Sequence, residues 1–157
     1  MGCVLGLDPG FGRLGFGAVG VVRGRTVVLD CGIISTDKDT PFGERLVQLA
    51  DDLESILRQL KPSKIVVEKL FFTKNAKTAM QVAEARGVLL YLAARRHIPV
   101  LEFTPSQVKS AVCGDGTADK KAVQKMVKLL LGLKTAPKID DAADALALAL
   151  MGAAIRE

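Results

Sequence analysis

Histidine and cysteine are scarce in this sequence, and their scarcity argues against several kinds of active site. His97 is the only histidine among the 157 residues. It follows two arginines near a predicted helix end, where a surface or capping role is typical, so we expect no Ser-His-Asp or Cys-His mechanism. The three cysteines, Cys3, Cys31 and Cys113, are far apart and form no C-x-x-C pair. We expect small buried residues in a reducing compartment rather than a disulfide framework or a zinc site.

Long hydrophobic runs are also lacking. The start of the chain has no basic segment followed by a long apolar stretch, so no signal peptide is expected. The apolar segment 142–155 contains Asp144 and is shorter than the roughly 20 residues of a membrane span. We expect it to be a buried helix in a cytoplasmic protein with no membrane partner. A Walker phosphate loop is absent too, because no Gly-Lys-Ser/Thr ends the glycine-rich stretch at residues 10–17.

The overall composition predicts one globular domain, spanning residues 1–157, with a basic surface. Hydrophobic residues make up 49% of the chain and charged residues 25%, which suits a single core large enough to fold unaided. Lysine and arginine number 22 against 17 acidic residues, giving a formal net charge of +5. This balance favours a polyanionic partner such as nucleic acid.

Hydrophobic periodicity predicts an α/β fold. An apolar run at residues 4–7 predicts a strand, and two β-rich stretches joined by a tight turn at Arg23-Gly24 follow it. Thr40 is expected to cap the next helix, with Pro41 in its first position. The elements expected in order are strands 4–7, 14–22 and 26–35, a helix to residue 60, strand 65–67, helix 75–96, strand 100–103, helix 105–112, a helix opening at residue 119 and a final helix from 140 or 141. Three antiparallel strands followed by parallel strands, flanked by helices, form one mixed sheet.

Four carboxylates fall where strands end or a helix begins. Asp8 and Glu68 each end a strongly apolar strand, and Asp141 and Asp144 are three residues apart on one helix face. Converging carboxylates repel one another and raise a pKa unless a cation joins them, so a hard divalent metal such as Mg²⁺ is expected. Two such ions about 3.5 to 4 Å apart can stabilise both the attacking and the leaving oxygen of a phosphoryl displacement.

Spacing alone leaves two questions about these residues open. An aspartate after a strand is also a common turn or cap residue, because its side chain accepts hydrogen bonds from nearby backbone amides. Asp140 stands four residues before Asp144, so spacing does not distinguish it from Asp141. The segment 10–15 matches G-x-G-x-x-G, but a strand follows it, and we expect its glycines to allow close packing.

Ordered motifs extend over nearly the whole chain. They are Leu5-Gly6-Leu7-Asp8-Pro9-Gly10, then Glu68 with Phe71, Lys74 and Asn75, then Asp141-Ala142-Ala143-Asp144-Ala145-Leu146-Ala147, with shorter matches at residues 15–17, 85–88, 107–109, 114–116 and 126–127. This set resembles the RuvC family of bacterial Holliday-junction resolvases. Actin-like ATPases and other RNase H-like nucleases share a Gly-x-Asp-x-Gly start, so the ordered set, not the first motif, carries the resemblance.

The resemblance implies a fold, an activity and partners. The fold is RNase H-like, and the activity is paired nicking of four-way DNA junctions in recombination and repair by a homodimer. Each subunit is expected to hold two Mg²⁺ ions, for which Mn²⁺ can substitute, and a branch-migration motor complex, RuvAB, is the expected partner. The metal-binding residues carried over are Asp8, Glu68, Asp141 and Asp144, with Asp141 chosen over Asp140.

The resemblance also places DNA-contacting and catalytic side chains. Lys120 is expected to hold a phosphate or stabilise charge on the transferring group, and Phe71 to contact unpaired bases, since stacking on an aromatic ring tolerates any sequence. Phe72 has either the same role or a packing role. The expected set of DNA-binding residues is Phe71, Phe72, Lys74, Asn75, Lys77, Arg86, Lys109 and Lys120, the basic ones making sequence-independent phosphate contacts.

Three other functions compete with this interpretation. A related nuclease acting on structured RNA would use similar carboxylates. An actin-like nucleotide-binding protein should carry a second glycine-rich acidic loop near mid-chain, and none is found in the sequence. A DNA-binding dimer without catalysis would bind junctions but not cut them when Mg²⁺ is added. For any dimer, the long helix starting near Asn75 is the expected contact surface.

Overall fold

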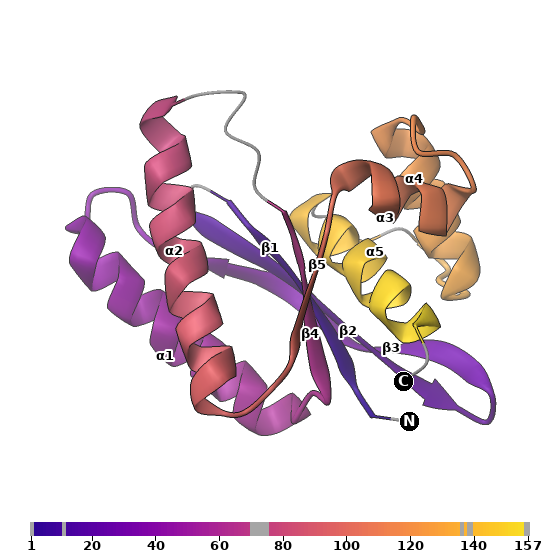
Figure 1. Cartoon of the computed structure of the whole chain (residues 1–157), viewed down its shortest axis with the longest axis horizontal. Helices are drawn as coiled ribbons and strands as arrows, with labels where there is room; N and C mark the ends of the chain where they lie inside the picture. Colours follow the sequence, from indigo (N-terminus) through magenta and orange to yellow (C-terminus); the bar gives the residue numbers. More distant parts are fainter. Residues whose placement is uncertain (1, 11, 70–75, 136, 138–139, 156–157) are drawn as a thin grey trace.

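A five-stranded mixed sheet organises the molecule (Figure 1). The computed structural model describes residues 2–10, 12–69, 76–135, 137 and 140–155. Its elements are β1 (Val4–Pro9), β2 (Arg13–Val22), β3 (Arg25–Ser35), α1 (Phe42–Leu60), β4 (Lys64–Glu68), α2 (Ala76–Arg95), β5 (Val100–Phe103), α3 (Pro105–Cys113), α4 (Lys120–Leu130) and α5 (Asp140–Ala154). The strand order is β3-β2-β1-β4-β5.

The pairing of the strands confirms the predicted α/β class. β1, β2 and β3 pair antiparallel, whereas β4 pairs parallel to β1 and β5 parallel to β4. The predicted tight turn joins β2 to β3, and both of its residues have positive φ, 50° at Arg23 and 78° at Gly24. Positive φ at both central residues is typical of the type I′ turn, one of the two common two-residue hairpin turns.

Helices cover both faces of the sheet. In Figure 1, α1 and α2 lie on one face, and α3, α4 and α5 lie on the other. Successive residues of a strand point to opposite faces, so Leu5 and Leu7 belong to the core under α1 and α2, while Val4 belongs to the core under α5. By the same alternation Asp8 at the end of β1 lies on the α5 face. Glu68 at the end of β4 also follows Val66 onto that face.

Glycines of the sheet bring α5 unusually close to the strands. An added Cβ would lie 1.9 Å from the Ala145 backbone oxygen at Gly6, 2.2 Å from the Asp141 oxygen at Gly15 and 2.7 Å from the Leu146 nitrogen at Gly17. These separations are far below any real carbon contact, so the helix backbone rests directly on the strand backbones. Close packing was the role expected for the glycines of residues 10–17. The structure shows that Gly15 and Gly17 pack against α5.

Some local predictions are wrong. α1 begins at Phe42, and Pro41 is its N-cap in an extended conformation (φ −51°, ψ 138°) with no side-chain cap, so Thr40 does not cap it. The cysteines are free, as expected, but only partly buried. Within the described residues, no helix has the length and apolar character needed to cross a membrane.

Candidate active site

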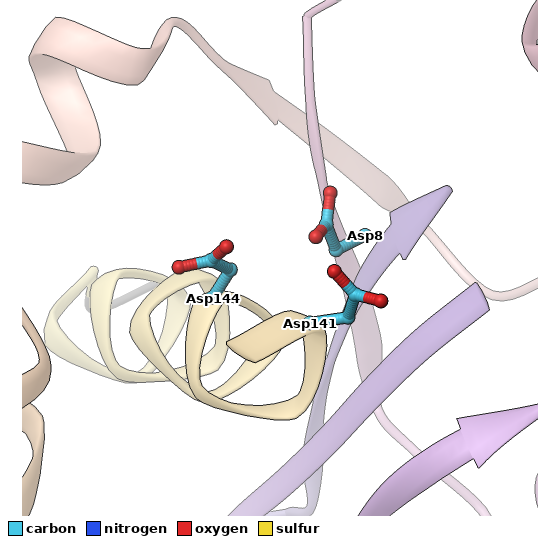
Figure 2. A group of neighbouring side chains, drawn as sticks. All are labelled: Asp8, Asp141 and Asp144. Carbon is cyan, nitrogen blue, oxygen red and sulfur yellow. The ribbon is translucent and has the colours of Figure 1, made fainter. Parts of the chain in front are cut away.

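Three carboxylates from distant parts of the chain meet at one edge of the sheet. Asp8 directly follows the buried part of β1, and Asp141 and Asp144 lie in the first turn and a half of α5. One oxygen from each of the three lies within 4.8 Å of the others. Figure 2 shows the three side chains beside one another, two of them on the same helix. Spacing and strand-end position had marked these residues as candidates, and the family resemblance had implied that they share one site.

The register of the sheet explains why Glu68 lies nearby. Leu7 pairs with Val67 across the parallel strands β1 and β4, so Asp8 and Glu68 follow at the same edge. Glu68 and Asp144 line a common cleft of about 270 Å³, together with Lys109 and Lys120. The carboxyl ends of neighbouring parallel strands are a frequent location for ligand sites in α/β proteins.

Burial and mutual repulsion perturb these carboxyl groups. Burial raises the pKa of Asp8 to about 7, with further increases from Asp144, Glu68 and Asp141 and an opposing effect from Lys120. Burial also raises the pKa of Glu68 and of Asp144. Crowded acids that resist ionisation in this way are stabilised by a positive charge placed among them.

Lys120 is the first residue of α4, and its ammonium group faces the cluster. Its Nζ lies 3.3 Å from a carboxylate oxygen of Asp144 and 3.3 Å from one of Asp140. Burial lowers the pKa of Lys120, but the two aspartates more than offset this and raise it. The lysine is therefore fully charged at neutral pH, as the expected role in phosphate binding requires.

The structure distinguishes the two adjacent aspartates. Asp140 is exposed, and it accepts a hydrogen bond from the Gln124 amide at 2.9 Å in addition to its pair with Lys120. Those contacts lower the pKa of Asp140, the opposite of the shift at Asp144. Asp141, not Asp140, belongs to the carboxylate cluster, which spacing alone could not decide.

Comparison with known proteins identifies the family. The family model described as crossover junction endodeoxyribonuclease RuvC matches residues 4–152. The chain is 48% identical over 153 residues to that enzyme from Pseudothermotoga lettingae, covering 98% of the chain and 94% of the relative. A solved structure described as Thermus thermophilus RuvC in complex with Holliday junction substrate superimposes with a TM-score of 0.91 at 36% identity, covering 98% of this chain and 93% of that one.

The chain belongs to the RuvC family. This confirms the predicted RNase H-like fold and the predicted class of enzyme, an endodeoxyribonuclease of crossover junctions. It also favours DNA-junction cleavage over the RNA-cleaving and nucleotide-binding alternatives. The relatives match along almost their entire length, so the resemblance concerns the whole domain rather than one motif.

Several DNA-contacting residues expected from the RuvC family remain predictions. Phe71, Phe72, Lys74 and Asn75 lie outside the described residues. Lys77 falls in the first turn of α2, and Lys109 lines the cleft beside Glu68. Lys109 also opposes the upward shift in the pKa of Glu68, so its charge is felt at the site.

Arg86 forms an ion pair within the fold. Its guanidinium forms an ion pair with Glu102 on β5 at 2.5 Å, and its side chain is only 16% exposed. A phosphate would have to compete with this carboxylate and draw the side chain out of the α2–β5 contact. The phosphate role expected for Arg86 stays a prediction.

Sequence reasoning missed one basic residue at the RuvC-family site. Arg13, the first residue of β2, places Nε 2.7 Å from a carboxylate oxygen of Asp141. A signal was available in the sequence: a short turn after Asp8-Pro9-Gly10 returns the chain antiparallel to β1, which brings residue 13 back to the edge where Asp8 lies. The observed pairing of Pro9 with Leu14 is that return.

Proposed function

We propose that this RuvC-family chain resolves four-way DNA junctions by metal-dependent phosphodiester hydrolysis at the cleft between Asp8, Glu68 and α5. The observation that supports this most is the convergence of three carboxylate oxygens within 4.8 Å, from residues as far apart in sequence as Asp8 and Asp144. The net charge of +5 suits a polyanionic substrate. Recombination and repair are the processes in which such junctions arise.

The residues present fit a hard divalent cation. Oxygen ligands from carboxylates are those that Mg²⁺ prefers, and the raised pKa values of Asp8, Glu68 and Asp144 are relieved by positive charge. Asp8, Asp141 and Asp144 would hold one ion, and Glu68 would contribute to a second, with Mn²⁺ able to replace Mg²⁺. When bound, the cations would supply Lewis acidity at the scissile phosphate.

The basic residues of the cleft would bind and orient the phosphate. Lys120 directs its Nζ at Asp144 from the start of α4, so a phosphate beside the carboxylates lies within hydrogen-bonding reach of that ammonium group. Lys109 lines the same cleft from α3. Both lysines would donate hydrogen bonds to non-bridging oxygens, whose charge increases in the transition state.

No histidine takes part in this chemistry. His97, the only one in the sequence, is exposed and follows the end of α2. The next strand, β5, begins beside Ile65 at the start of β4 and ends beside Glu68. His97 therefore lies toward the edge of the sheet opposite the carboxylates, which agrees with the absence of a histidine mechanism inferred from composition.

We further propose a homodimer that makes two matched nicks, since a symmetric junction is most simply cut by two matched subunits. The outer groove between α1 and α2 supports this proposal because it presents large apolar side chains to solvent, Val47 at 60% and Tyr91 at 61% exposure. Sedimentation at micromolar concentration tests it, and a monomer there would argue against it. A cytoplasmic location and contact with the RuvAB motor complete the proposed function.

One assay tests the proposed function directly. Synthetic four-way junctions, linear duplex and structured RNA of equal length are incubated with the chain in Mg²⁺, Ca²⁺ or chelator, and products are resolved to the nucleotide. Paired nicks confined to the junction and dependent on Mg²⁺ are expected. Preferential cleavage of RNA would favour the competing nuclease function, and binding without scission would leave a non-catalytic DNA-binding protein.

A further inference from the structure

Arg13 forms an ion pair with Asp141, one of the proposed metal ligands. Its Nε lies 2.7 Å from an oxygen of Asp141, and the two side chains are 57% and 23% exposed. A carboxylate oxygen that accepts a short hydrogen bond from a guanidinium has less capacity left to bind a cation. Arg13 and a divalent ion therefore compete for Asp141.

The backbone next to the Arg13 side chain is hydrogen-bonded, whereas the side chain itself is exposed. The Gly10 amide donates to the Arg13 carbonyl oxygen at 2.9 Å, and the Thr36 amide donates to the Gly12 oxygen at 3.0 Å. Arg45, buried at 6% exposure, anchors the same turn through a hydrogen bond from Nε to the Thr36 hydroxyl at 3.0 Å. The Arg13 side chain lies at the edge of the carboxylate cluster, where it contacts Asp141.

Two cations thus border the cluster. Arg13 contacts Asp141, and Lys120 contacts Asp144, while oxygens of both aspartates lie within 4.8 Å of each other and of Asp8. A phosphate bound at these carboxylates through a metal would have a guanidinium next to one aspartate and an ammonium next to the other. Guanidinium groups bind phosphate oxygens in a bidentate fashion that lysine cannot match.

We propose that Arg13 is a DNA phosphate-binding residue of the active site, which Asp141 holds in place until a divalent cation takes that carboxylate. The inference rests on the proposed metal-dependent function of the same cleft. Cation binding at Asp141 releases the guanidinium, and the released side chain then binds a phosphate of the strand to be cut. The metal and the DNA contact are coupled through one side chain.

Removing the side chain has two opposite effects under this proposal. Arg13→Ala binds Mg²⁺ more tightly than the wild type, by up to about fivefold, because partly exposed ion pairs contribute up to about 1 kcal/mol. The same variant binds a four-way junction more weakly in Ca²⁺. It also lowers the slope of log K against log salt by about 0.9, the value for one lost phosphate contact.

A matched control is available at the other end of the same hairpin. Arg25 is exposed at the start of β3 and pairs with Val22, whereas Arg13 pairs with Ser35. Arg25→Ala removes the same charge without touching the cluster. Mg²⁺ affinity is measured by calorimetry without DNA, and junction affinity by titration in Ca²⁺ at several salt concentrations, for the wild type and both variants.

The outcomes separate this inference from the proposed function. Tighter Mg²⁺ binding together with a reduced salt slope in Arg13→Ala, but not in Arg25→Ala, supports it. Equal Mg²⁺ affinity, or an unchanged salt slope, in Arg13→Ala overturns it while wild-type cleavage stays intact. A wild type that neither binds Mg²⁺ nor cuts the junction would overturn the proposed function itself.

Discussion

The ionisation of Asp8 should destabilise the metal-free protein at neutral pH. Burial, reinforced by the neighbouring carboxylates, raises the pKa of Asp8 from 3.8 to about 7 in the folded state. The unfolded chain binds fewer protons at this site between those two values, so stability falls as pH rises from about 4 to 7 and the loss is complete above 7. Each unit of difference is about 1.4 kcal/mol, which gives a total on the order of 4 kcal/mol.

Asp8→Asn removes the ionisation and therefore the penalty. In chelator, we expect the variant to be more stable than the wild type by on the order of 4 kcal/mol at pH 8. The advantage should shrink by about 2 to 3 kcal/mol at pH 5, where the wild-type carboxyl is largely protonated. Thermal and denaturant unfolding from pH 5 to pH 8 measure both quantities, and at a few degrees per kcal/mol the shift in Tm at pH 8 should be about 10 °C.

A control and an added cation sharpen this test. Asp52→Asn makes the same chemical change at an exposed position on α1, outside the carboxylate cluster, and serves as the control. Mg²⁺ should stabilise the wild type at pH 8 and have little effect on Asp8→Asn. If the stability difference between Asp8→Asn and the wild type is the same at pH 5 and pH 8, the carboxyl is not perturbed and the electrostatic reasoning for the site is wrong.

Three further substitutions test other parts of the site. Glu68→Gln should abolish junction nicking while junction binding, measured by gel shift in Ca²⁺, persists; full cleavage would remove Glu68 from the proposed machinery. Lys120→Ala should lower the single-turnover cleavage rate by about 10² to 10³, and a change below threefold would exclude a role in charge stabilisation. Gly15→Ala should destabilise the fold by at least about 1 to 3 kcal/mol, because its Cβ would lie 2.2 Å from the Asp141 backbone oxygen. Gly43→Ala, which meets nothing within 4 Å in α1, should be neutral or slightly stabilising by the same denaturant assay.

Much of the fold was predictable because its signals are local. Apolar runs that stop at Asp8 and Glu68 gave both strand ends, and the Arg23-Gly24 turn gave the hairpin. The start of α1 was predicted wrongly, since Thr40-Pro41 has a good capping composition but Pro41 stays extended and the helix begins one residue later. Composition does not report the backbone dihedrals on which a cap depends.

The acidic residues of the candidate site were predicted from the sequence, but the basic residue that pairs with one of them was not. Strand-end positions and a three-residue helical spacing marked Asp8, Asp141 and Asp144 as candidates, and the family resemblance implied that they share one site. The choice of Asp141 over Asp140 needed the family resemblance, because only tertiary packing shows that Asp140 turns outward to Gln124. The Arg13 contact was missed because the turn after Gly10 indicates only that residue 13 returns to this edge of the sheet, whereas its ion pair with Asp141 depends on where α5 packs.

Because the acidic cluster joins β1 to α5, it can form only after α5 has been synthesised. Asp8 leaves the ribosome well before Asp141 and Asp144 are made, because more than a hundred residues separate them in the chain. The first strands can form their hairpin during synthesis, since their contacts are local, but of the acidic cluster they hold only Asp8. A growing or prematurely terminated chain that lacks α5 thus has no complete acidic cluster, so DNA in the cell is not exposed to a nuclease that is only partly made.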